Sequence, residues 1–219
     1  MGVVINQDYK NSIQQYAQQR SINSLLHFTR IENLEAILKA GIIPRATLQQ
    51  NSAVNIVNDS MRLDRHLDAS CISITFPNYK MFYRLRSEEE TRDEDWVVIG
   101  ISPEVLWEKD CAFCYSNAAT SAIATSNIET FKNRQAFENM FSEFTGKPAR
   151  TQMGLLINET TDPQAEVLVF DIIEPEYFQG IACYNETVKN KLVEKYENEF
   201  YFAEGSGLFS YRDDYEFWR

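Results

Sequence analysis

The sequence predicts a single α+β domain whose core is mostly β-sheet. Its 219 residues suit one domain of ordinary size, and 44% of them are hydrophobic, which is enough to form a real core. Short apolar runs typical of buried strands are mixed with helical patterns, without repeats and without a linker. We therefore treat residues 1–219 as one domain. Its core lies at about 22–186, and a C-terminal helix and an acidic, aromatic tail follow at 187–219.

The first third of the chain begins with a polar helix at residues 8–20 and a short apolar strand, LLHF, at 25–28. The next segment, TRIENLEAILKAG, predicts a helix from the spacing of its apolar residues. Thr29 is expected to cap this helix, with Glu32 completing a capping box, and Gly41 is expected to end it.

The rest of the chain alternates between the two kinds of element. Strands are predicted at 71–76, 95–102, 111–115, 166–173 and 177–185. Helical patterns lie at 79–86, 103–109, 128–143 and 185–196. Polar segments at 45–60 and 145–163 predict loops, the first with irregular helix as an alternative.

The net charge of −11 argues against tight, nonspecific binding to nucleic acid, which depends on Lys and Arg that neutralise phosphates. The basic residues are unevenly distributed, however, because six of them fall in one third of the chain. These are Arg62, Arg65, Lys80, Arg84, Arg86 and Arg92. A local basic groove is therefore compatible with the negative net charge of the whole chain.

The four cysteines do not have the spacing of a metal site, because the CAFC pair has no second pair to complete four ligands. We expect Cys71, Cys111, Cys114 and Cys183 to be buried, reduced thiols, and we expect no metal. No apolar run reaches the ~20 residues of a membrane helix, and the N-terminal sequence lacks a secretory pattern. The expectation is a soluble, cytoplasmic protein without a membrane partner.

Glu166 stands directly before the apolar run VLVF, and two interpretations of it stay open: a satisfied strand end or a positioned catalytic carboxylate. Three other features bear on the choice. His27 lies where a strand meets a helix, and SNAA, at 116–119, is a turn of small residues after a strand. The pair Arg62 and Arg65 suits either a neighbouring aspartate or a diphosphate.

The order of these pieces resembles the DarT family of nucleic-acid ADP-ribosyltransferases. The matching motifs are LHFT-x-x-ENL-x-x-IL-x-x-G, RLD, SITFPNYKMFY, SNAA and QAEVLV, and they run from about residue 25 to residue 185. The resemblance implies an ADP-ribosyltransferase-like fold with two packed, mostly antiparallel sheets flanked by helices, and NAD bound between the sheets. NAD would serve as co-substrate, with no metal.

The resemblance also assigns roles to residues. Glu166 matches the catalytic glutamate, and either Arg62 or Arg65, with Arg65 favoured, matches the arginine that meets the NAD phosphates. The positions expected to bind NAD are His27, Phe28, Thr29, Asn33, Arg65, Met81 and Tyr83. A carboxylate such as Glu166 suits this chemistry, because cleavage of the bond to nicotinamide passes through an oxocarbenium-like state.

The loop at about 145–164 matches the loop that grips the acceptor nucleic acid. The positions expected to bind the acceptor are Asn117, Gln164, Tyr79, Arg84 and Arg150. Asn117 stands where the thymine-modifying branch tends to have histidine, which favours guanine over thymine. Two interpretations of Tyr79, Phe82 and Tyr83 stay open, because these rings suit either stacking on a base or packing in the core.

These assignments predict transfer of ADP-ribose to a base of single-stranded nucleic acid, DNA first and RNA second, because a single strand avoids the cost of extruding a base. The resemblance implies a toxin or anti-phage effector with an antitoxin partner, and a chaperone is a further candidate partner. The alternatives are a protein or small-molecule acceptor, or an inactive module that binds NAD or nucleic acid. The acidic, aromatic tail is expected to close over the fold or to dock a partner.

Overall fold

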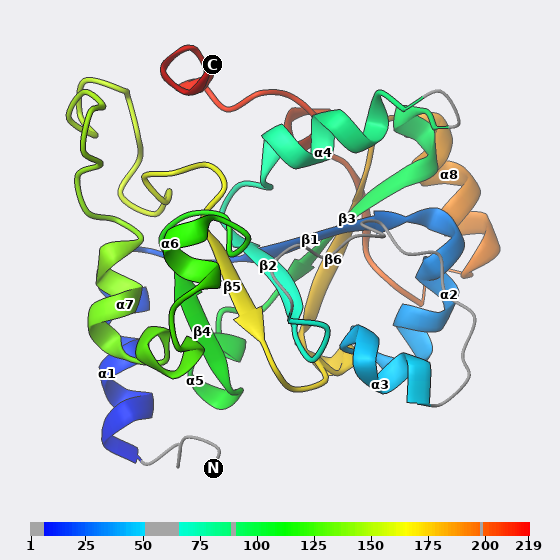
Figure 1. The fold of residues 1–219 in the computed structure, drawn as a ribbon. Coiled ribbons are helices and arrows are strands. Elements are labelled where there is room, and N and C mark those ends of the chain that lie inside the picture. Colours follow the sequence, from blue (N-terminus) through cyan, green and yellow to red (C-terminus); the bar gives the residue numbers. More distant parts are fainter. Residues whose placement is uncertain (1–6, 51–65, 89–90, 198) are drawn as a thin grey trace.

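The computed structural model describes residues 7–50, 66–88, 91–197 and 199–219 (Figure 1). Seven strands lie in the order β4-β5-β2-β1-β3-β6-β7, and helices flank them, so the expected α+β class is confirmed. The strands are β1 Leu25–Arg30, β2 Ser70–Ile74, β3 Trp96–Ile101, β4 Cys111–Cys114, β5 Glu166–Val169, β6 Phe178–Cys183 and β7 Phe202–Glu204. The helices are α1 Gln7–Gln19, α2 Ile31–Ala40, α3 Arg45–Gln50, α4 Tyr79–Arg86, α5 Val105–Glu108, α6 Ser121–Ala124, α7 Arg134–Asn139 and α8 Glu186–Lys195. Short 3₁₀ turns lie at Asp93–Asp95, Ile128–Phe131, Pro175–Tyr177, Ser206–Phe209 and Tyr215–Trp218.

Strand β2 joins the two halves of the sheet because it changes partner along its length. Its first three residues, Ser70 to Ile72, pair with β5, whereas Ser73 and Ile74 pair with Leu26 and Leu25 of β1. The prediction of two packed sheets is corrected in this respect, because the seven strands are hydrogen-bonded side by side in one continuous sheet. The connection is only two residue pairs long, so β4-β5-β2 and β1-β3-β6-β7 diverge beyond it.

The helices cover the sheet at separate places. In Figure 1, α1 and α7 lie near β4 and β5, α2 and α8 lie toward the opposite end, and α4 runs above β3. The strand interiors are almost fully buried, as in Val97, Ile99 and Val167, each at 0% exposure. Continuous apolar runs of this kind are typical of strands covered on both faces.

Two local features differ from expectation. Thr29 does not cap α2, because it lies inside β1, where it pairs with Val97. Arg30 occupies the cap position without a side-chain hydrogen bond, so the expected capping box with Glu32 is absent. Strand β2 also ends earlier than predicted, because Thr75 adopts the left-handed conformation, with φ of 64°. Such a conformation is costly for a β-branched residue.

The C-terminal segment packs on the fold instead of hanging free. Strand β7 adds to β6 in parallel, and the residues after it run back over α4 toward the loop at 145–164 (Figure 1). Arg212, Asp214 and Trp218 in this segment are buried at 4%, 0% and 6% exposure. Of the two expectations for the tail, closing over the fold is therefore the one that the structure shows.

Candidate functional site

Glu166 is a buried carboxylate at the first position of β5. Its side chain is enclosed at 7% residue exposure, and its backbone pairs with Cys114 of β4. The amide N–H of Ala118, in the turn that follows β4, donates to Oε1 of Glu166 over 2.6 Å. A hydrogen bond of this length to a carboxylate is charge-assisted and fixes the orientation of the side chain. The interpretation of Glu166 as a positioned group thus gains a specific geometric basis.

Asp162 ties the same turn to the segment that leads into β5. Its Oδ2 accepts a hydrogen bond of 2.6 Å from the hydroxyl of Ser116, and its Oδ1 accepts one of 2.8 Å from the amide of Gln164. Ser116 and Asp162 are both buried. Asp162 therefore holds the turn after β4 against the segment that leads into β5, next to the contact between Ala118 and Glu166.

His27 lies at the other side of β2, where the partner change occurs. The β1–β2 pairing stops at Leu26 and Ser73, and the ring Nδ1 of His27 lies 3.0 Å from the carbonyl oxygen of Cys71. Glu166 lies next to Val167, which closes the β2–β5 pairing opposite Ile72. The topology thus brings His27 and Glu166 to the two sides of one short stretch of β2.

The remaining predicted NAD-binding residues of β1 and α2 fall into two groups. Thr29 and Asn33 are buried, and the Asn33 amide donates to the Thr29 hydroxyl over 3.2 Å. Phe28 instead stacks on Phe82 of α4, with ring centroids 4.5 Å apart. Because neighbouring strand residues point to opposite faces, Phe28 lies on the face of the sheet opposite to His27 and Thr29.

Helix α4 places its predicted residues in different environments. Tyr79 and Phe82 are buried at 4% and 1% exposure, which favours packing in the core over stacking on a base for both rings. Tyr83 is 48% exposed, and Arg84 on the same helix is also exposed. Met81 packs against the apolar cluster around Phe82.

Arg150 organises the loop before β5 from within. Its guanidinium donates to the Thr161 hydroxyl at 2.6 Å and to the carbonyls of Leu156 and Glu159 at 2.8 and 2.7 Å. Burial lowers the pKa of this guanidinium, and the nearby charges of Arg20 and Arg212 lower it further. These contacts give Arg150 a structural part in the loop, in place of the exposed contact expected for an acceptor-binding residue.

The other predicted positions are placed as follows. Asn117 accepts a hydrogen bond of 2.9 Å from the amide of Ala119, so its side chain braces its own turn. Gln164 lies two residues before Glu166 and is partly exposed. Arg62 and Arg65 lie outside the described residues.

Sequence reasoning missed Asp162 and Arg212. Asp162 had a weak signal, because an aspartate before a proline and close to Glu166 is typical of a turn. Arg212 had none, since its contacts lie about fifty positions away, with the carbonyls of Thr160 and Thr161.

Within the described ranges, His, Cys, Asp and Glu form no group of three or more that could hold a metal. Among the same residues, no helix is long and apolar enough to cross a membrane.

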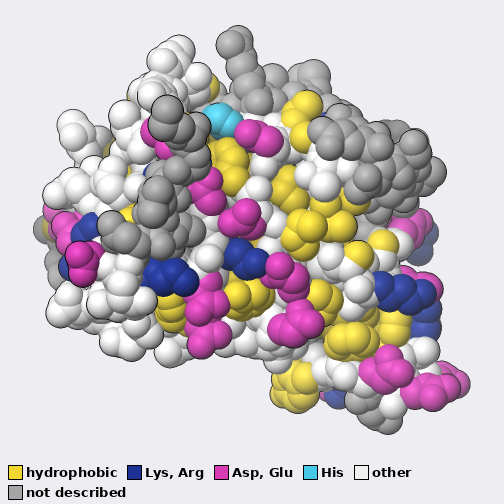
Figure 2. All heavy atoms as spheres, turned by 90° about the horizontal axis from the view of Figure 1, so that it is seen from below, with side chains coloured by type: hydrophobic (Ala, Val, Ile, Leu, Met, Phe, Trp, Pro, Cys, Tyr) yellow, Lys and Arg dark blue, Asp and Glu magenta, His cyan; other side chains and the backbone are white. Residues whose placement is uncertain are grey.

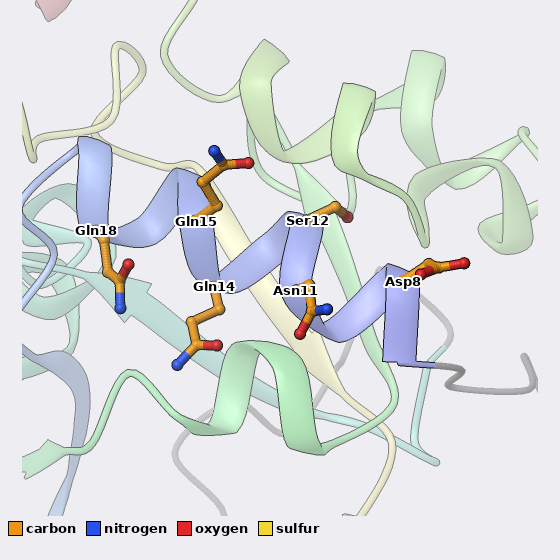
Figure 3. Close-up of a pocket in the computed structure, with 6 residues that line it drawn as sticks. All are labelled: Asp8, Asn11, Ser12, Gln14, Gln15 and Gln18. Atoms are coloured by element: carbon orange, nitrogen blue, oxygen red, sulfur yellow. The ribbon is translucent and has the colours of Figure 1, made fainter.

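A hollow on α1 is lined by Asp8, Asn11, Ser12, Gln14, Gln15 and Gln18. Figure 3 shows these side chains spreading to different sides of the helix, so they do not converge on a ligand.

The surface bears on the expected basic groove. On the face in Figure 2, basic and acidic side chains are interspersed with apolar ones. Among the described residues on that face, no continuous basic surface appears. The thiols of Cys111, Cys114 and Cys183 are buried, as expected, whereas Cys71 is partly exposed.

The family model described as "ssDNA thymidine ADP-ribosyltransferase, DarT" matches residues 26–204. The chain belongs to the DarT family. The expected family, the DarT ADP-ribosyltransferases, is thereby confirmed. No curated protein matches the chain.

Solved DarT structures share the fold. Thermosipho africanus DarTG in complex with ADP-ribose has a TM-score of 0.62 at 18% identity, over 85% of this chain and 51% of that one. This chain thus spans about half the length of the DarTG chain. Thermus sp. 2.9 DarT in complex with NAD+ has a TM-score of 0.56 at 15% identity, over 86% of this chain and 98% of that one. The same DarT in complex with ADP-ribosylated ssDNA has a TM-score of 0.54 at 14% identity, over 87% and 97% of the two chains.

Proposed function

We propose that this chain transfers ADP-ribose from NAD to a base of single-stranded DNA. The observation that carries the proposal is the buried Glu166 carboxylate, held by the Ala118 amide at the entry of β5, in a chain whose residues 26–204 match the DarT model. The DarT structures with NAD+ and with ADP-ribosylated ssDNA support it through their common fold.

The side chains near the point where β2 changes its pairing from β5 to β1 have the chemistry to bind NAD. His27, Thr29 and Asn33 supply an imidazole, a hydroxyl and an amide, and the last two are already joined by a hydrogen bond. These groups suit a carboxamide and ribose hydroxyls, which both donate and accept. Arg65, or Arg62, would meet the phosphates, since a guanidinium binds them in a fork geometry.

NAD supplies an activated ribose carbon and nicotinamide as the leaving group. Glu166 places negative charge where positive charge develops on the ribose, and its burial strengthens that attraction. The hydrogen bond from the Ala118 N–H keeps the carboxylate in one orientation, in which it would hold a ribose hydroxyl or accept a proton from the attacking base.

The proposal extends to the acceptor and to the biological role. We favour guanine over thymine because of Asn117, although the family description names thymidine. Gln164 and the exposed Arg84 and Tyr83 are proposed to contact the strand. The chain would act in the cytoplasm as a toxin or anti-phage effector restrained by an antitoxin protein.

The test is incubation with labelled NAD and separate pools of single-stranded DNA, RNA and protein. We expect label in DNA only, and we expect its loss in Glu166→Gln but not in Glu186→Gln, which alters an exposed carboxylate on α8. Oligonucleotides with a single guanine or a single thymine then identify the base. Label in RNA or protein alone would replace DNA as the acceptor, and binding of NAD without transfer to any pool would indicate an inactive module.

A further inference from the structure

The tail after residue 204 lies beyond the part of the chain that matches the family, yet it reaches the loop before Glu166. Arg212 donates to the carbonyl oxygens of Thr160 and Thr161 over 2.9 and 3.1 Å. Both threonines are buried, at 3% and 2% exposure. The tail thus supplies partners for backbone groups that have no access to water.

A buried ion pair holds Arg212 in place. Its Nε and one terminal nitrogen donate to the two oxygens of Asp214 over 2.7 and 2.6 Å. The indole N–H of Trp218 donates to the same carboxylate over 2.8 Å. The guanidinium of Arg212 therefore joins Asp214 of the tail to the loop before Glu166.

The end of the tail is anchored by two lysines from different parts of the fold. Lys80 on α4 donates to the carbonyl of Trp218 over 2.7 Å, and Lys147 in the loop donates to the carbonyl of Phe217 over 2.5 Å. The indole of Trp218 also packs edge-on against Phe144. The tail is consequently fixed to both the helix and the loop that flank the site.

A chain of hydrogen bonds continues from Arg212 to the carboxylate. The Thr160 hydroxyl donates to the carbonyl of Asp162 over 3.0 Å, and Asp162 receives the hydroxyl of Ser116. Ser116 begins the turn whose Ala118 amide holds Glu166. Displacement of the loop backbone would therefore reach the turn and the carboxylate.

Buried ion pairs contribute little net stability, because desolvation offsets much of their attraction, so a pair of this kind is better explained by the geometry that it enforces. We propose that Arg212 is a positioning residue, which holds the segment from Thr160 to Gln164 so that Ala118 and Glu166 keep their reactive arrangement. This inference rests on the proposed transferase function. Arg212 would act through the loop, because its hydrogen bonds are with Thr160, Thr161 and Asp214.

The test compares two variants with the wild type in the full chain. Arg212→Met/Asp214→Leu removes the pair without leaving a buried, unpaired charge, so the fold is expected to survive. Arg212→Lys keeps the charge but lacks the planar fork that reaches both carbonyls and Asp214. Arg219→Met is the matched control, because Arg219 belongs to the same tail and its side chain is 69% exposed.

We expect both variants to lower kcat by about 10- to 100-fold while the KM for NAD stays near the wild-type value, since misplacement of reacting groups acts on the chemical step. Arg219→Met should leave both unchanged.

Hydrogen–deuterium exchange supplies a readout that does not depend on activity. We expect faster exchange confined to residues 156–166 and the turn at 116–119 in both variants. Unchanged kcat and exchange would overturn the proposal, as would a uniform rise in exchange with a lower melting temperature, which indicates a purely structural role. A wild type without transfer would count against the proposed function, while the exchange data would still decide whether Arg212 holds the loop.

Discussion

The imidazole Nδ1 of His27 lies 3.0 Å from the carbonyl oxygen of Cys71, across the point at which β1 and β2 stop pairing. A carbonyl oxygen only accepts hydrogen bonds, so Nδ1 carries the hydrogen in this contact. The backbone of β2 therefore sets the orientation of the ring, and in the neutral ring it also sets the tautomer.

Replacement of His27 by Ala should weaken NAD binding by about five- to tenfold, the equivalent of about 1 kcal/mol for one lost hydrogen bond. Isothermal titration calorimetry measures the Kd. His66→Ala is the control, because His66 is the second histidine of the chain and lies beside Asp68. An equal loss in both variants would contradict a specific role for His27.

Replacement of Ser116 by Ala should lower the free energy of unfolding by about 1–3 kcal/mol, because the buried Asp162 carboxylate loses a donor at 2.6 Å. Urea denaturation measures the change, and transfer activity should fall with it. Ser121→Ala alters an exposed serine nearby and should have little effect. Stability equal to the wild type would show that the Ser116 contact contributes nothing.

Replacement of Arg150 by Met should open the loop locally, because three hydrogen bonds to Thr161, Leu156 and Glu159 are lost together. We expect faster proteolytic cleavage near Leu156 and Ile157, which are exposed apolar residues. Mass spectrometry of the fragments locates the cut. Lys191→Met, on the exposed side of α8, should cleave at the wild-type rate.

Replacement of Tyr83 by Ala should weaken binding of single-stranded DNA, since base stacking on an aromatic ring contributes about 1–3 kcal/mol per base. Tyr83 is 48% exposed, and its ring lies 5.1 Å from that of Tyr211. Fluorescence anisotropy with a labelled oligonucleotide measures the Kd. Tyr201→Ala, which removes another exposed ring at 71% exposure, should leave the Kd unchanged.

The cysteines should react in a fixed order. Burial raises the pKa of Cys183 to about 11, so at neutral pH its thiolate is scarce, whereas Cys71 is partly exposed. Timed alkylation followed by peptide mapping should label Cys71 first and Cys183 only after unfolding. Early labelling of Cys183 would show that the β6 region opens in the native state.

The strands were predictable because burial on both faces leaves continuous apolar runs, as in β3, and Glu166 was conspicuous because a charge interrupts that rule. The cap at Thr29 was not predictable in this way. Its hydroxyl and the glutamate three positions later satisfy the local pattern, but pairing with Val97 kept Thr29 in the strand. Tertiary pairing overrode a local preference.

Tyr79 and Tyr83 show what local sequence cannot decide. They lie one turn apart on α4 and have the same chemistry, yet they are 4% and 48% exposed. The ring of Tyr211, from the distant tail, contacts both rings, so the difference in exposure comes from the rest of the packing around each of them. The contacts of Arg212 were likewise not predictable from local sequence, because only folding brings the tail to the loop.

The bond from Arg212 to the Thr160 carbonyl spans 52 positions of sequence, and this separation has a consequence for synthesis. A ribosome makes the loop and the Glu166 strand first and the arginine later. At about 5–20 residues per second, the delay is about 3–10 s. During that interval the nascent chain contains the strand that carries Glu166 but not yet Arg212, so the hydrogen bonds that hold the loop before Glu166 form late in synthesis.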